Sequence, residues 1–106
     1  MKKAMISQPM RDKTDEEISA VREKAIATLK ENGYEVINTW FNDWCGIGGS
    51  DIVNKPLYCL AKSLEIMSHC DAVYFCDGWA NTRGCLIEHE AATKYGLDIM
   101  YETCIE

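Results

Sequence analysis

Hydrophobic and polar residues along the chain follow two alternating periodicities, one typical of strands and one typical of helices. Short apolar runs predict strands at residues 3–7, 34–38, 72–76 and 97–101. Between these runs, apolar residues recur at spacings of three and four, which predicts helices beginning near Thr14, Pro56 and Gly84. Because strands and helices alternate, we expect right-handed crossovers and an α/β fold. The simplest arrangement is a doubly wound four-stranded parallel sheet of order 2-1-3-4, a flavodoxin/Rossmann-like three-layer sandwich formed by residues 1–106 as a single domain.

Two of the predicted helices have clear starting signals. Thr14 and Glu17 match a capping box, and Pro56 suits the first turn of a helix. The positions expected to face the core are Ile18, Val21, Ala25 and Leu29 in the first helix and Leu57, Leu60, Ala61, Leu64 and Met67 in the second. The run at 72–76 is apolar on both faces, which is typical of a central parallel strand covered by helices on both sides.

Polar loops follow the first and third predicted strands. In the expected order these strands are neighbours whose helices leave toward opposite faces, so the loops at 7–13 and 77–83 should flank one crevice. The groups suited to a sugar or a phosphate are Ser7, Gln8 and Arg11 in the first loop and Asp77, Asn81, Thr82 and Arg83 in the second. The sequence contains neither a dinucleotide-binding nor a P-loop fingerprint.

Glu88 is the most informative polar residue of the third predicted helix. Steps of three and four connect it with Gly84, Ala91, Ala92 and Tyr95. Its carboxylate should therefore point inward, where an unpaired charge is costly. Glu88 can be a nucleophile or general base at the crevice. It can equally pair with Arg11 or Arg83, or simply be partly exposed near the helix start, where the helix dipole favours negative charge.

Composition and charge narrow the classes of partner. The 106 residues are 47% hydrophobic and 26% charged, which is ordinary for one globular domain. The formal net charge of −6 and the lack of a Lys/Arg cluster argue against a nucleic acid polymer as partner, because that affinity depends on cationic side chains. Without a long apolar run or a signal segment, we expect a cytoplasmic protein with no membrane partner.

The six cysteines are Cys45, Cys59, Cys70, Cys76, Cys85 and Cys104. No CxxC pair occurs, and most of these residues lie beside apolar side chains, so free buried thiols are favoured over disulfides. A metal site built from His69, Cys70 and His89 would match no known ligand spacing. We therefore expect no metal and no cofactor.

Several motifs match a known family when they are taken together. They are Met5-Ile6-Ser7-Gln8-Pro9-Met10, Asp71-Ala72-Val73, the Gly84 and Glu88 pair spaced by four, and Ala92 and Gly96 before the last strand. In these motifs the chain resembles the nucleoside 2-deoxyribosyltransferase superfamily, which includes the 2'-deoxynucleoside 5'-phosphate N-hydrolases. The resemblance covers nearly the whole chain. It extends in particular to a branch of short bacterial and phage proteins with a Trp before the Gly and an acidic, histidine-containing helix after it.

The resemblance implies an activity and a substrate class. The glutamate matching Glu88 would attack the anomeric carbon of a 2-deoxyribosyl group, so that the chain would cleave an N-glycosidic bond or transfer the deoxyribosyl group. The partner would be a small-molecule nucleoside or nucleotide, with Ser7 and Arg11 at the sugar or 5'-phosphate. The expected substrate-binding residues are Ser7, Gln8, Arg11, Asp77, Trp79, Asn81, Thr82 and Gly84. Trp79 could stack on the base or pack as a structural cap.

Three positions depart from the pattern of the transferases. The aspartate that assists the leaving base corresponds to Ser63, the tyrosine that orients the nucleophile to Met5, and the aspartate that contacts the base to Thr82. The acids that could substitute are Asp77, Asp51 and Asp43.

Two other functions stay open from the sequence. A non-catalytic nucleotide- or nucleotide-sugar-binding module would keep the crevice without the acid. An interaction protein would instead use the long segment 39–55, whose Trp40, Phe41 and Trp44 are types typical of binding hot spots. A homo-oligomer is compatible with this function and with the enzyme.

Overall fold

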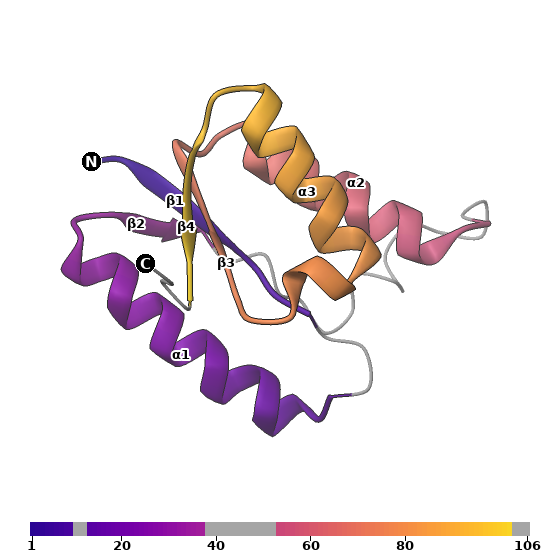
Figure 1. Ribbon diagram of the computed structural model, residues 1–106, viewed down its shortest axis with the longest axis horizontal. Helices are drawn as coiled ribbons and strands as arrows, with labels where there is room; N and C mark the ends of the chain where they lie inside the picture. The colour runs from indigo at the N-terminus through magenta and orange to yellow at the C-terminus, as the bar shows by residue number, and fades with distance from the viewer. Residues whose placement is uncertain (10–12, 38–52, 103–106) are drawn as a thin grey trace.

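The computed structural model describes residues 1–9, 13–37 and 53–102, which form a parallel sheet between two layers of helices (Figure 1). The elements are β1 (Lys3–Ser7), α1 (Asp15–Glu31), β2 (Glu35–Ile37), α2 (Lys55–Met67), β3 (Ala72–Phe75), the 3-10 helix η2 (Trp79–Asn81), α3 (Arg83–Lys94) and β4 (Asp98–Tyr101). The four strands lie in the order β2-β1-β3-β4, and each neighbouring pair is parallel. In Figure 1, α1 covers one face of the sheet, and α2 and α3 cover the other. The expected fold class and strand order are confirmed.

Both predicted helix starts are also confirmed. The Glu17 amide donates to Thr14 Oγ1 at 3.1 Å, and the Thr14 amide donates to Glu17 Oε1 at 3.3 Å, which completes the capping box of α1. Asn54 caps α2, because its side-chain oxygen accepts from the Leu57 amide at 3.0 Å. Pro56 lies in the first turn, where its missing N–H costs no hydrogen bond.

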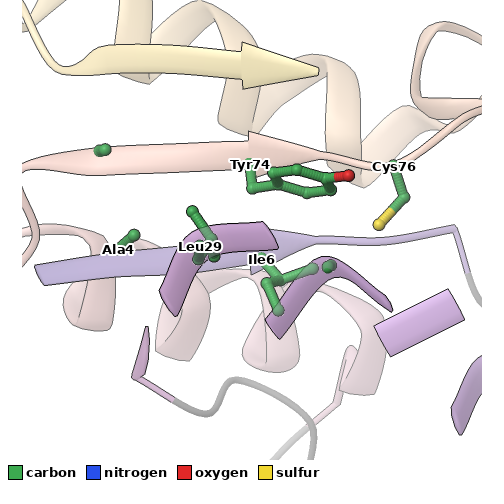
Figure 2. Packing of buried hydrophobic residues seen from close by; sticks show 7 residues of the cluster. Ala4, Ile6, Leu29, Tyr74 and Cys76 are labelled. Carbon is green, nitrogen blue, oxygen red and sulfur yellow. The ribbon is translucent and has the colours of Figure 1, made fainter. Parts of the chain in front are cut away.

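One half of the core lies between the sheet and α1. Even-numbered residues of β1 and β3 face this helix, among them Ile6 and Tyr74, and Leu29 packs on them (Figure 2). Leu29 and Ala25 are almost fully buried, as the spacing of α1 predicts, whereas Val21 is only half-buried.

The other half lies beneath α2 and α3. Odd-numbered residues face this side, so Met5, Val73 and Phe75 pack with Met67 of α2 and Ala92 of α3. Because β3 is buried on both faces, it is the central strand that its composition predicts.

The core prediction is wrong at three positions. Leu57 and Ala61 are exposed, since the first turns of α2 extend away from the sheet and only its last turns reach the core (Figure 1). Tyr95, which was expected to share the inward face with Glu88, is 84% exposed. Tyr95 is the C-terminal cap of α3, so the helical period no longer sets its direction.

Several sequence predictions fall on residues 10–12, 38–52 and 103–106, which lie outside the described residues. They concern Arg11, Trp40, Phe41, Asp43, Trp44, Cys45, Asp51 and Cys104, and with them most of the aromatic segment 39–55. No helix in the described part of the chain is long and apolar enough to cross a membrane.

Candidate functional site

A pocket of about 800 Å³ opens at the carboxyl ends of β1 and β3. Its walls come from both predicted loops and from the start of α3, and its lining includes Pro9, Lys13, Asp77, Gly78, Asn81, Thr82, Arg83 and Gly84. The loops approach each other where a Cβ on Gly78 would lie 3.5 Å from Pro9 Cγ. Gly78 has a φ of 89°, a conformation that favours glycine. The crevice expected from the strand order is therefore confirmed.

The start of α3 gives the pocket a positive wall. Thr82 is the N-cap residue, but its Oγ1 donates to the Gly78 carbonyl at 3.2 Å and makes no hydrogen bond to the helix start. The first turn carries no acidic residue. Because the partial positive charge of a helix start attracts anions, this end of α3, together with Arg83 and Lys13, suits a negatively charged ligand group.

Glu88 lies one helical turn after Gly84, about 6 Å further along the helix axis. Its side chain is only 8% exposed, and Ser7 Oγ donates to Glu88 Oε1 at 2.5 Å. Burial raises the pKa of Glu88, whereas hydrogen bonds from Ser7 and Ser63 and the positive charge of Arg22 lower it. The inward direction predicted for Glu88 is confirmed, and the carboxylate is held by donors from two different elements.

This raised pKa predicts how Glu88 affects stability. The folded protein holds a proton on Glu88 more tightly than the unfolded chain does, so the stability due to protonated Glu88 is complete below the ordinary pKa of 4.5 and is lost as pH rises through the raised value. The Glu88→Gln variant should therefore gain roughly 1 kcal/mol in free energy of unfolding at neutral pH. In urea denaturation experiments the gain should shrink as the pH falls through the raised pKa toward 4.5. An equal gain in free energy of unfolding at neutral pH and below pH 4.5 would contradict this account.

Ser7 and Gln8, two of the predicted binding residues, use their side chains within the protein. Ser7 is 2% exposed and bonded to Glu88, whereas Gln8 is 9% exposed and faces α1. Gln8 Nε2 donates to the Ile18 carbonyl at 2.8 Å, and Gln8 Oε1 accepts from Arg22 Nε at 3.0 Å. The end of β1 therefore connects α1 and α3 through buried polar contacts.

Sequence reasoning missed Arg22. Of the two cations proposed to neutralise Glu88, Arg83 is exposed and Arg11 lies outside the described residues. Within the described part of the chain, the positive charge that lowers the pKa of Glu88 is that of Arg22, which is 5% exposed. The helical spacing could have predicted that Arg22 is buried, because it lies four residues after Ile18 and three before Ala25 on the buried face of α1.

Trp79 lies in a group of aromatic side chains, away from the pocket lining. Its ring stacks on His89 with the centroids 4.1 Å apart and the planes inclined by 19°. Phe75 and Tyr101 lie 5.5 and 5.7 Å from it, and His89 Nε2 is 2.8 Å from the Tyr101 hydroxyl oxygen. One face of Trp79 is therefore occupied by His89, which agrees with a structural cap.

Among the described cysteines, Cys76 and Cys85 are free buried thiols, as expected, whereas the free thiol of Cys70 is only half-buried. Burial raises the pKa of Cys76 to about 12 and that of Cys85 to about 11. Both thiols are thus protonated at neutral pH and are poor nucleophiles. Within residues 1–9, 13–37 and 53–102, no group of three or more His, Cys, Asp or Glu side chains could hold a metal ion.

The positions that depart from the transferase pattern have distinct places. Met5 is fully buried in the core, Ser63 hydrogen-bonds Glu88, and Thr82 lines the pocket. Asp77 also lines the pocket.

Comparison with known proteins gives one match. No curated protein and no solved structure matches the chain. A family described as a domain of unknown function (DUF4406) matches residues 2–101. Since this match covers nearly the whole chain, the protein belongs to the DUF4406 family.

Proposed function

We propose that the protein cleaves the N-glycosidic bond of a deoxynucleoside or deoxynucleotide, or transfers its 2-deoxyribosyl group, with Glu88 as the nucleophile. One observation carries the proposal: a buried carboxylate, held by Ser7 and Ser63, lies one turn along α3 from the wall of a polar pocket. Burial of an ionised carboxylate lowers the stability of the folded protein, and such destabilising burial is typical of a catalytic group.

The chemistry follows from the carboxylate and its donors. A Glu88 oxygen forms a bond to the anomeric carbon while the bond from that carbon to the base nitrogen breaks and the base leaves with its electron pair. The negative charge of Glu88 stabilises the oxocarbenium-like centre that develops. Water, or a second base, then attacks the anomeric carbon and gives its proton to the group that protonated the departing base, while the bond to Glu88 breaks and its electron pair returns to the carboxylate. Ser7 holds the carboxylate orientation through both steps.

A proton for the departing base must come from an acid in the pocket. Ser63 cannot supply it in the manner of a carboxylic acid, and it already contacts Glu88. Asp77 lines the pocket and lies two residues after the end of β3, so we assign it this role.

A deoxynucleoside monophosphate fits the pocket better than an uncharged nucleoside. Lys13, Arg83 and the start of α3 provide positive charge for a phosphate group. The volume of about 800 Å³ is in the range of small-ligand sites.

The test is release of free base from a panel of deoxynucleosides and their 5'-monophosphates, measured by liquid chromatography. We expect release from at least one monophosphate and slower release from the matching nucleoside, because only the monophosphate interacts with the positive wall. Reactions with a second base added distinguish transfer from hydrolysis. No release from any compound would contradict the proposal.

A second function is favoured by the burial of Glu88. With only 8% of the side chain exposed, the protein is also suited to bind a nucleotide or nucleotide sugar without cleaving it. A rise in melting temperature with such a ligand, in the absence of base release, would identify a binding module, since a ligand that binds only the folded state stabilises it.

A further inference from the structure

All the buried polar and charged side chains of residues 1–9, 13–37 and 53–102 meet at the end of β1. They are Ser7, Gln8, Arg22 and Glu88, each at most 9% exposed. Ser7 binds Glu88, Gln8 binds Arg22, and Ser7 and Gln8 are consecutive in the chain. Glu88 and Arg22 are therefore the two ends of one buried network, in which two hydrogen bonds are joined through the backbone between Ser7 and Gln8.

The pleat of β1 explains how the network passes from one layer to the other. Side chains alternate along a strand, so Ser7 faces α2 and α3, as Met5 does, whereas Gln8 faces α1. The Ser7 carbonyl accepts from the Cys76 amide at 3.0 Å, which ties this point of β1 to the end of β3. A movement of Gln8 would therefore also displace Ser7.

We propose that Arg22 is a positioning residue for Glu88, which rests on the proposed function: it anchors Gln8, and so the end of β1 that presents Ser7 to the Glu88 carboxylate. Glu88 needs this support because its burial favours the protonated acid, which cannot attack a carbon centre. Burial raises the pKa of Glu88 and lowers that of Arg22, and each charge partly opposes the shift of the other group.

Among the described residues, the other groups named around the pair do not replace the charge of Arg22. Ser7 and Ser63 donate hydrogen bonds to Glu88 but carry no charge. Burial raises the pKa of the Cys85 thiol, beside Glu88, to about 11 and that of Cys76, beside Arg22, to about 12, so both stay neutral near pH 7.

The test follows the Glu88 carboxyl carbon by NMR titration of glutamate-labelled protein, with Glu88→Gln to assign the signal. In Arg22→Met the midpoint of Glu88 should move to higher pH, and Arg22→Lys should return it toward the wild-type value. Arg22→Gln is a second neutral variant, whose amide can still donate to Gln8. Lys24→Met, on the exposed side of α1, is the matched control and should leave the midpoint unchanged.

Kinetic measurements separate positioning from a purely structural role. If base release is found, both neutral variants should lower kcat roughly 10-fold, as loss of a supporting contact commonly does, with little change in KM. The acid limb of the pH profile should move upward with the NMR midpoint. A folded neutral variant with the wild-type Glu88 midpoint would overturn the proposal. The titration needs no substrate, so its result is independent of whether the proposed activity exists.

Discussion

Replacing Glu88 by glutamine is expected to reduce base release by roughly 10⁴-fold, within the range that removal of a catalytic nucleophile produces. Glutamine has nearly the same shape, and its carbonyl oxygen can still accept the hydrogen bond that Ser7 donates. It cannot form the glycosyl ester, because the amide is a far weaker nucleophile than the carboxylate. Initial rates of base release with the preferred monophosphate measure the effect.

Glu90→Gln is the matched control for this substitution. Glu90 lies on the same helix but is exposed, so the variant should release base at a rate within about twofold of the wild-type protein. Mass spectrometry of the quenched wild-type reaction should find a deoxyribosyl adduct on the α3 peptide that contains Glu88. Release by Glu88→Gln at a tenth of the wild-type rate or more would show that Glu88 is not the nucleophile.

Replacing Phe75 by alanine is expected to lower the free energy of unfolding by about 3–5 kcal/mol. Phe75 has no exposed surface, and its ring centroid lies 4.9 Å from that of His89 and 5.5 Å from that of Trp79. The substitution would leave a cavity where β3, η2 and α3 meet. Urea denaturation measures the loss, which would remove a large part of the total stability of a small domain.

Tyr95→Ala is the control for the stability measurement. Tyr95 is an aromatic residue at the end of α3, but it is 84% exposed, so its loss should change stability by no more than about 0.5 kcal/mol. A loss below about 1 kcal/mol in Phe75→Ala would mean that the aromatic group does not hold α3 on the sheet. Because Phe75 pairs with Ser7 in the sheet register, the variant should also weaken the contact of Ser7 with Glu88.

The element types and their order could be predicted from the sequence because they depend on local patterns. The capping box at Thr14 and the apolar period of α1 act within a few residues of the chain. The strand order was predicted as the simplest one compatible with right-handed crossovers between parallel strands. From this order alone the loops after β1 and β3 could be placed around one pocket, and the spacing of Gly84 and Glu88 indicated a carboxylate on the inner face of α3.

The tertiary structure decided what surrounds that carboxylate. Ser7 and Glu88 are separated by 81 positions, and Arg22 lies in another layer from Glu88. The periodicity of a single helix or strand therefore cannot predict these interactions. Periodicity identifies the buried face of a helix, but the partner of a buried polar side chain depends on how the layers pack. For the same reason the sequence by itself determined the fold and the inward direction of Glu88. Only packing decided that Ser7 and Ser63 donate hydrogen bonds to it and that the positive charge of Arg22 lowers its pKa.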